Sequence, residues 1–241
     1  MPRLRIVLVE PREAGNVGAV ARVMKNFGFD ELWIVGEHPE LLPVSGWWAS
    51  GADDLLATAR FGASLIDAVA DAHLTVATTS MRGRTSPVSF TSRTLAERFA
   101  SLDADQTLAL VFGREDHGLT REELMLCQHT AAIPTNERFP TMNLAQSAGV
   151  FCYELSFIVS ASAPAPIARE LPDAAAIERL HQRARELLLE VGFLHDSNPD
   201  RIYDDLRNMV ARADLDAREA TIVLGIIRQI EWRVRSPGVP H

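Results

Sequence analysis

The sequence contains only two cysteines, Cys127 and Cys152, which lie far apart and lack the spacing of a metal site. Each occurs in an apolar helical context that suits a small buried side chain, and the seven histidines show no ligand pairing. We therefore expect neither a disulfide nor a metal centre. No apolar run approaches the roughly 20 residues of a membrane-spanning helix, and the first residues lack the pattern of a signal peptide. These absences predict a cytoplasmic protein with no membrane partner.

Lysine is almost absent, because only Lys25 among the 24 basic residues is a lysine. Cationic contacts must therefore come from arginine, whose planar guanidinium binds phosphate in a bidentate manner and stacks on bases. The net charge of -8 argues against a nucleic-acid partner, since Lys and Arg carry the affinity for phosphate. However, Arg82, Arg84, Arg93 and Arg98 lie in one stretch with a single acidic residue. This stretch predicts a local basic surface, and an ordinary solvated surface is the alternative.

Strand and helix patterns alternate along the first two thirds of the chain. Apolar runs of strand length occur at RIVLVE, LWIVG, LTVATTS, TLALVFG and TAAIPT. Helical patterns lie between them, over residues 16–27, 50–59, 64–71, 92–100, 120–127 and 143–160. This alternation predicts an α/β fold with a parallel, doubly wound sheet.

The composition changes after Ser160 to a stretch rich in alanine and proline, which is typical of a linker. We expect one domain over residues 1–160, a linker over 161–173 and a small all-helical domain over 174–241. Its three helices are predicted to begin near residues 174, 199 and 216, and the residues expected to point inward include Leu180, Leu187, Ile202 and Met209.

A glycine-containing segment, GNVGAVA, follows the first predicted strand and suggests a dinucleotide-binding site. The fingerprint G-x-G-x-x-G of such sites follows its strand directly. Here five residues separate Glu10 from Asn16, and Val17 replaces the middle glycine that lets a pyrophosphate approach the backbone. An oxidoreductase that binds a nicotinamide or another nucleotide is therefore one alternative.

Four segments carry polar residues suited to binding or catalysis. In the helix that begins near Asn16, Arg22 lies nearly opposite the apolar stripe, so it does not serve that helix's core contact. FGREDHGL ends a predicted strand with a glycine and then presents Arg114 and Glu115 at the carboxyl edge of the sheet, where ligands bind. Any one of these would read alone as a turn or a solvated surface. The other two segments are TTSMRGR at 78–84 and a Pro-bearing loop and helix at 133–151.

Together and in this order, these segments resemble the SpoU (TrmH) family of RNA ribose methyltransferases, within the SPOUT superfamily. Three motifs carry the likeness. Their residues are Asn16, Gly18 and Arg22, then Phe112, Gly113, Arg114 and Glu115, and finally Thr141, Met142 and Asn143. Thr141 stands where the family commonly has serine, and its hydroxyl keeps the same hydrogen-bonding capacity.

The resemblance implies a Rossmann-like α/β domain whose C-terminal part forms a trefoil knot, a topology that proteins rarely adopt. It also implies S-adenosyl-L-methionine as the cofactor, bound in a bent form inside the knot. By position, the residues that would bind it are Thr78, Thr79, Ser80, Gly113, Ile133, Pro140, Thr141 and Met142.

The implied reaction is in-line transfer of a methyl group from a sulfonium to a ribose 2'-hydroxyl, without a metal. Because that hydroxyl is a poor nucleophile until its proton leaves, the site needs accurate placement and a proton acceptor. The family gives the acceptor role to Arg22, although arginine side chains are poor bases. Alternatively, Arg22 orients phosphate and hydroxyl while another group or water accepts the proton. The catalytic residues expected are Arg22, Asn16, Glu115, Thr141 and Asn143.

The helical tail extends the likeness over nearly the whole chain. Its VGF, NPDRI and EATIVLGII segments resemble the C-terminal extension of family members that methylate a cytidine or uridine ribose at tRNA position 32. Since family members are homodimers with sites at the interface, we expect a homodimer and tRNA as partners. A ribosomal RNA 2'-O-methyltransferase and a noncatalytic RNA-binding module stay open as alternatives. Candidates for tRNA binding or dimer contact in the tail are Arg201, Arg207, Arg212 and Arg218.

Overall fold

The computed structural model describes residues 2–41, 44–80, 88–159, 169–195 and 199–236. Its internal contacts divide the chain into two compact units, Met1–Ala168 and Arg169–His241. The first unit is an α/β domain and the second is helical. The domain boundary at residue 160 and the linker up to residue 173 stay predictions, and residues 161–168 of that linker lie outside the described part of the chain.

The first unit is built on a seven-stranded sheet in which every neighbouring pair of strands is parallel. The strand order is β3-β2-β1-β6-β4-β7-β5. The parallel α/β sheet predicted from the sequence is therefore confirmed, and the five predicted apolar runs form five of its strands. The short β3 and β5 lie at the two edges and are not predicted by the pattern. The strands are β1 (Arg3–Val9), β2 (Glu31–Val35), β3 (Arg60–Gly62), β4 (Leu74–Thr79), β5 (Phe90–Thr91), β6 (Thr107–Phe112) and β7 (His129–Ala132).

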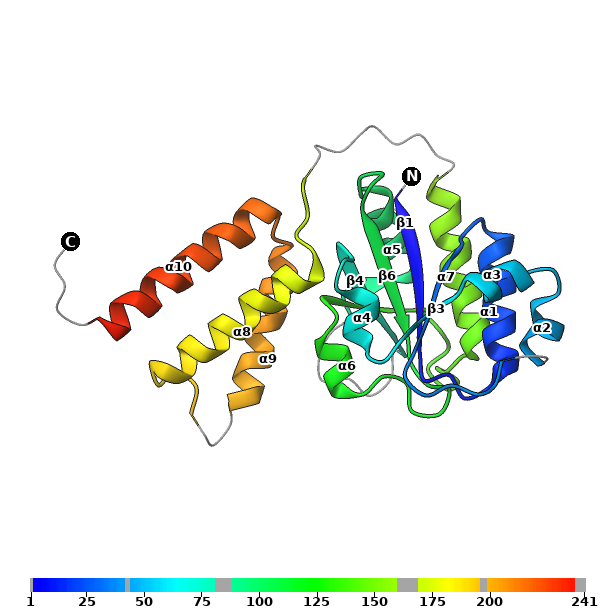
Figure 1. Cartoon of the computed structure of the whole chain (residues 1–241), viewed down its shortest axis with the longest axis horizontal. Coiled ribbons are helices and arrows are strands. Elements are labelled where there is room, and N and C mark those ends of the chain that lie inside the picture. The colour runs from blue at the N-terminus through cyan, green and yellow to red at the C-terminus, as the bar shows by residue number, and fades with distance from the viewer. Residues whose placement is uncertain (1, 42–43, 81–87, 160–168, 196–198, 237–241) are drawn as a thin grey trace. The chain divides into compact units, whose positions relative to one another are not determined.

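Helices cover both faces of the sheet, with α1 and α7 on one side and α4 and α6 on the other (Figure 1). The segment predicted as one helix over 50–59 contains only α3, because Gly51 has a φ of +90° that interrupts the helix after α2. Within the described residues, no helix has both the length and the apolar character needed to cross a membrane. The helices of this unit are α1 (Ala14–Asn26), α2 (Val44–Ala49), α3 (Asp53–Thr58), α4 (Leu65–Val69), α5 (Ser92–Ala100), α6 (Arg121–Met125) and α7 (Leu144–Val159).

The central strands are buried on both faces, which explains why they read as continuous apolar runs. In β1, Val7 and Val9 belong to a buried cluster that includes Val69 of α4. Because successive side chains of a strand point to opposite faces, Ile6 and Leu8 point toward the other helical layer. All four β1 side chains are at most 3% exposed.

The carboxyl ends of β1, β6, β4 and β7 lie side by side, because these strands are adjacent and parallel. The loops that leave them therefore meet at one edge, where open α/β sheets bind ligands. The chain segments singled out in the sequence follow these four strands. The trefoil knot implied by the resemblance stays a prediction.

The second unit consists of α8 (Ala174–Glu190), α9 (Pro199–Ala213) and α10 (Ala217–Arg235). Leu180 and Leu187 of α8 pack with Ala220 and Ile227 of α10 in a small apolar cluster. The Asp216 carboxylate accepts the Glu219 backbone N–H at 2.8 Å, while the Glu219 carboxylate accepts the Asp216 N–H at 2.8 Å. This reciprocal capping satisfies amides that the first turn of α10 leaves unpaired.

The inward face expected for α9 is partly wrong. Ile202 and Met209 are 41% and 57% exposed, whereas Tyr203 is only 6% exposed. The Tyr203 hydroxyl donates a hydrogen bond to the carbonyl of His181 in α8. Because this hydrogen bond holds Tyr203 inward, the buried face of α9 is rotated by about one residue from the face that apolar periodicity indicates.

Candidate active site

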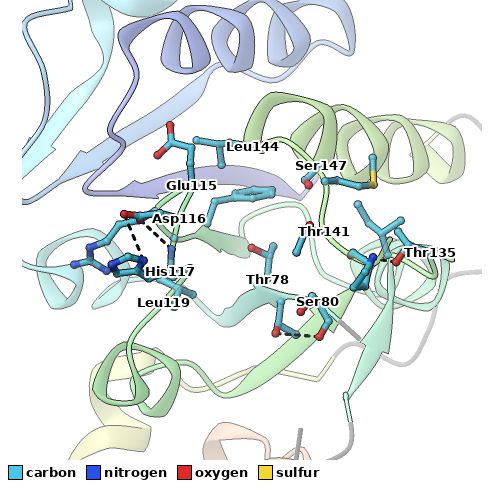
Figure 2. A pocket seen from close by; sticks show the side chains of 18 of the residues that line it. Thr78, Ser80, Glu115, Asp116, His117, Leu119, Thr135, Thr141, Leu144 and Ser147 are labelled. Atoms are coloured by element: carbon cyan, nitrogen blue, oxygen red, sulfur yellow. Dashed lines mark hydrogen bonds and ion pairs between the residues drawn. The ribbon is translucent and has the colours of Figure 1, made fainter. Parts of the chain in front are cut away.

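A cavity of about 360 Å³ opens at the carboxyl edge of the sheet, within the size range of small-molecule sites. Its walls come from the segments that follow β4, β6 and β7 and from the start of α7. Figure 2 shows Thr78, Ser80 and Thr141 gathered around this space. All eight residues expected to bind the cofactor line it, although that role stays a prediction: Thr78, Thr79, Ser80, Gly113, Ile133, Pro140, Thr141 and Met142.

The walls of this pocket combine rings with fixed polar groups. The rings of Phe112 and Phe151 meet edge to face with centroids 5.9 Å apart, and both side chains line the pocket. The Thr78 hydroxyl donates to the Val111 carbonyl at 2.9 Å, which anchors the end of β4 to β6. Such a pocket can enclose a ring system while hydroxyl, amide and carbonyl groups fix its orientation.

At Gly113 the pocket wall comes very close to another part of the backbone. A Cβ atom at this position would lie 2.2 Å from the carbonyl carbon of Gly118 and 2.3 Å from the nitrogen of Leu119. No other residue fits without backbone movement. Arg114 and Gly118 close the turn with two backbone hydrogen bonds, from Arg114 N to Gly118 O at 3.2 Å and from Gly118 N to Arg114 O at 2.9 Å.

Three predicted catalytic residues form a polar network, which we define as Asn16, Glu115 and Asn143. The Asn16 side-chain Nδ2 donates to Glu115 Oε1 at 2.8 Å, and Asn143 Nδ2 donates to Asn16 Oδ1 at 2.9 Å. These residues come from α1, from the loop after β6 and from the loop before α7. The network therefore joins three segments that are far apart in the sequence.

Each end of the polar network is also anchored to backbone. Glu115 accepts the backbone N–H of Arg12 at 2.9 Å and that of Glu13 at 3.3 Å, just before α1 begins. Asn143 Oδ1 accepts the N–H groups of Ala145 at 2.9 Å and Gln146 at 3.3 Å. Both side chains thus accept hydrogen bonds from N–H groups that a helix start leaves without backbone partners. These hydrogen bonds orient the Glu115 and Asn143 side chains.

Arg114 points away from the polar network and binds two carboxylates. We call Glu10, Arg114 and Glu123 the Arg114 cluster. Arg114 Nε donates to Glu10 Oε2 at 2.9 Å, while Nη1 and Nη2 bind the two oxygens of Glu123 at 3.0 Å each. The Arg114 side chain is 10% exposed, so the paired charges are largely removed from water. This bidentate geometry fixes the loop after β6 against β1 and α6.

The contacts within the Arg114 cluster shift the pKa values of Arg114 and Glu10 in the expected directions. The hydrogen bonds to Glu123 and Glu10 raise the pKa of Arg114 above its usual value. The hydrogen bond from Arg114 lowers the pKa of Glu10 below its usual value of 4.5, and the attraction between the charges adds to this. Arg114 and Glu10 are therefore held in their charged forms at neutral pH.

Arg22 does not line the pocket. It is exposed on α1, six residues after Asn16, and among the described residues it has no hydrogen-bond or ion-pair partner. In the described part of the chain, Arg22 thus belongs neither to the pocket nor to the polar network. Of the four other residues expected to be catalytic, Glu115 and Thr141 line the pocket directly, while Asn16 and Asn143 reach it through the polar network.

The predicted basic stretch is only partly described. Arg82 and Arg84 lie outside the described residues. Arg93 lies 3.4 Å from the Glu154 carboxylate in an ion pair, and Arg98 donates to the Ser101 hydroxyl at 2.8 Å. Both described arginines therefore make contacts within the domain, and a basic surface here stays a prediction.

Comparison with known proteins agrees with this geometry. Residues 3–153 match the model of the SpoU rRNA Methylase family. The chain belongs to this family. Residues 175–238 match a second family model, that of the C-terminal domain of the tRNA methyltransferase TrmJ. The first match covers both the pocket and the polar network, so the site lies in the part of the chain that the SpoU family shares.

The likeness to individual TrmJ proteins extends along nearly the whole chain. A tRNA (cytidine/uridine-2'-O-)-methyltransferase TrmJ of Yersinia enterocolitica is 35% identical, over 97% of this chain and 93% of that protein. The crystal structure of TrmJ from Z. mobilis has a TM-score of 0.79 and 27% identity, covering 96% of this chain and 99% of that one. The structure of the SpoU methyltransferase AviRb from Streptomyces viridochromogenes in complex with AdoMet has a TM-score of 0.51 and 21% identity. The match covers 64% of this chain and 60% of that one.

The SpoU fold also explains why GNVGAVA is not a dinucleotide site. Helix α1 begins at Ala14, so Gly15 and Gly18 lie inside the helix rather than in the turn before it. The N–H groups of Asn16 and Val17 already donate to the Glu13 carbonyl. Backbone amides used in this way cannot bind a pyrophosphate.

Sequence reasoning missed the two carboxylates that hold Arg114. Glu123 forms a capping box with Thr120, and the T-x-x-E spacing at the start of the predicted helix could have shown that local role. No sequence signal indicates that Glu123 also binds Arg114. Glu10 has a φ of +45°, a conformation that favours glycine, and nothing in the sequence marks it.

We predict that Glu10→Gln lowers the free energy of unfolding by about 2 kcal/mol at neutral pH, because it removes a charged partner from Arg114. The lowered pKa of Glu10 gives stability that is complete above its usual pKa of 4.5 and is lost as pH falls through the lowered value. The difference in unfolding free energy between wild type and Glu10→Gln should therefore shrink as the pH falls below 4.5. Urea unfolding at neutral and acidic pH measures it, with the exposed Glu37→Gln as control. A difference that is constant across pH would contradict the assignment.

Gly113→Ala should lower the free energy of unfolding by more than about 2 kcal/mol, because the added methyl meets backbone atoms of the turn. Gly149→Ala in α7 is the matched control, since its Cβ would meet only Val23 methyl groups at 3.8 and 3.9 Å. The control should be neutral or slightly more stable because alanine favours helix. Equal urea midpoints for both variants would show that the close approach is unimportant.

Proposed function

We propose that this chain is a tRNA methyltransferase that moves a methyl group from S-adenosyl-L-methionine to a ribose 2'-hydroxyl. One observation carries the proposal. The eight residues expected to bind the cofactor line a single pocket, next to a hydrogen-bonded network of three residues expected to be catalytic. The TrmJ name of relatives that match nearly the whole chain supports tRNA as the substrate.

The pocket fits the proposed cofactor in size and in charge. Its volume of about 360 Å³ suits a nucleoside with a short side chain. Arg114 is neutralised by Glu10 and Glu123, whereas Glu115 and Asp116 add negative charge at the wall. A pocket lined by this excess of negative charge favours a cationic sulfonium over an anionic nucleotide.

When bound, S-adenosyl-L-methionine would supply an electrophilic methyl group on a positively charged sulfur. The chain's own residues would place the ribose for in-line attack. Glu115 already accepts three N–H groups, so we assign it a positioning role in which it holds Asn16. Thr141 and Asn143 lie at the entrance to α7, where a hydroxyl and an amide can bind ribose oxygens.

Arg22 would orient the ribose hydroxyl and an adjacent phosphate, or accept the proton as the resemblance implies. Since Arg22 does not reach the pocket of its own chain, we propose that it acts in the pocket of a second copy. A homodimer with shared sites follows from this assignment. The knotted C-terminal part of the domain is proposed on the resemblance alone.

The described surface contains a face suited to such a dimer. Phe27 at the end of α1 packs edge to face on Tyr153 of α7, with centroids 6.0 Å apart, and Tyr153 packs on Phe157 at 5.2 Å. Tyr153 and Phe157 are 48% and 63% exposed. Contiguous exposed rings on a monomer mark an interaction surface. This surface lies on α7 and at the end of α1, the helix that carries Arg22.

We propose the cytidine or uridine at tRNA position 32 as the target, and the cytoplasm as the place of action. Residues 1–160 would carry catalysis, with residues 174–241 as a helical domain that grips tRNA. In the tail, Arg201, Arg212 and Arg218 are exposed, whereas Arg207 donates to Glu178 at 2.8 Å. The three exposed arginines are therefore the better candidates for phosphate contact.

Unmodified tRNA should acquire 2'-O-methylcytidine or 2'-O-methyluridine when incubated with the protein and S-adenosyl-L-methionine. Mass spectrometry of the released nucleosides, followed by fragment mapping, identifies the base and its position. Ribosomal RNA from a methylation-deficient source tests the alternative named by the SpoU family description. Methylation of ribosomal RNA but not of tRNA would reject the proposed substrate.

Arg22→Ala should reduce the methylation rate by at least about 100-fold, the usual scale for positioned acid-base or electrostatic groups. It should leave the dissociation constant for S-adenosyl-L-methionine within about twofold, because the role proposed for Arg22 is toward the ribose and phosphate of the RNA and Arg22 does not line the pocket of its own chain. Calorimetric titration measures that constant. A loss of cofactor affinity as large as the loss of rate would contradict the role.

Tyr153→Ser combined with Phe157→Ser should convert a dimer into monomers, because the two substitutions replace apolar rings at the contact with small polar side chains. Sedimentation velocity measures this change. The monomers should lose methylation because Arg22 could no longer reach a second pocket. Ile66→Ser on α4 is a control, since Ile66 is 52% exposed on the opposite face of the sheet. Full activity in a monomeric variant would reject the shared site.

A further inference from the structure

Two adjacent tryptophans on α2 are unusually exposed. Trp47 is 75% exposed and Trp48 is 60% exposed in the described structure. Indole rings bury more area than most side chains, so two exposed rings on consecutive residues indicate a surface that has a binding role. Neither residue belongs to the pocket or to the polar network.

The Trp48 ring lies against the first turn of α1. A Cβ atom on Gly15 would lie 3.2 Å from both Cδ1 and Nε1 of Trp48, so the indole rests on the bare backbone of that glycine. The next residue in the chain is Asn16, which joins Glu115 to Asn143 in the polar network. Figure 1 shows α2 beside α1. The ring is therefore one residue away from the proposed catalytic machinery.

Helix geometry places Arg22 on the same face of α1 as Gly15. Seven residues at about 100° each bring Arg22 within about 20° of Gly15, roughly 10 Å further along the axis. The Lys25 ammonium is already bound to Asp54 at 2.7 Å and to the Gly51 carbonyl at 2.9 Å. Arg22, by contrast, has no partner among the described residues. One face of α1 thus carries an indole at one end and an available guanidinium about two turns away.

We propose that Trp47 and Trp48 form a stacking subsite for an unpaired nucleobase next to the methylated nucleotide of the RNA. The subsite rests on the proposed function, because it takes the RNA loop as its occupant. Single-stranded RNA is recognised through bases that stack on aromatic rings, together with cations that bind the phosphates. The tryptophan pair and Arg22 supply these two elements along one helix face.

The arrangement favours a nucleobase over a partner helix. Residues that dock a helix usually repeat every three or four positions, whereas Trp47 and Trp48 are consecutive and point about 100° apart on a six-residue helix. Trp48 is held in place by Gly15, so it presents a preformed ring face. Trp47, which is more exposed, extends that surface outward.

Steady-state methylation of full-length tRNA by the intact protein tests the subsite. Trp47→Leu and Trp48→Leu keep an apolar side chain but remove the ring, and each should raise the KM for tRNA about 10-fold, the loss expected for one stacked base. Trp48→Phe should stay within about threefold of wild type. In all variants kcat and the dissociation constant for S-adenosyl-L-methionine should change less than about twofold. Phe61→Leu is the matched control, because Phe61 is 54% exposed on the edge strand β3.

Three outcomes would overturn the subsite. One is an unchanged KM for tRNA in both leucine variants. Another is dissociation of a wild-type dimer by either leucine substitution in sedimentation velocity, which would make the tryptophans a contact between subunits. A phenylalanine variant as impaired as the leucine variant would also reject stacking.

Tryptophan fluorescence separates this proposal from the proposed function. An RNA hairpin that carries the anticodon loop should quench the wild-type emission, and each leucine variant should lose part of that quenching. This readout needs no methyl transfer. Quenching without methylation would reject the proposed reaction and keep the subsite, whereas methylation with quenching that is unchanged in both leucine variants would reject the subsite alone.

Discussion

The backbone contact between Gly113 and Gly118 is the constraint on which the site depends. It leaves no room for a Cβ atom, so the loop after β6 turns back on itself in one way only. Arg114 therefore enters the space between Glu10 and Glu123, while Glu115 turns toward α1 and α7. The same turn fixes a structural ion pair on one side and the polar network on the other.

The polar network shows how a site can be held in place although every member is on a loop or at a helix end. Glu115 engages N–H groups before α1, and Asn143 engages N–H groups at the start of α7. Asn16 joins them through both ends of one amide. Each side chain is thus held by groups that the helices must satisfy in any case. Precise placement here comes from helix ends rather than from deep burial.

The sequence predicted the central strands well because each is buried on both faces and reads as an unbroken apolar run. The edge strands β3 and β5 hold too few residues to give such a signal. The lining of the pocket was predictable because motif residues follow parallel strands to one edge. Glu10 was not, since its role depends on a tertiary contact with a residue 104 positions away. For α9, periodicity gave the helix but not the hydrogen bond that rotates Tyr203 inward.

The charge of the site supports the role proposed for Arg22. The chain has a net charge of -8, and the pocket wall carries Glu115 and Asp116. The guanidinium in that wall, Arg114, is bound to two carboxylates and has no donor left for a third anion of comparable strength. A negatively charged RNA backbone approaching the described pocket would therefore meet repulsion without a balancing cation. Arg22 is exposed, lies off its own helix's core face and is unpaired among the described residues. These properties support the proposal that it supplies this cation.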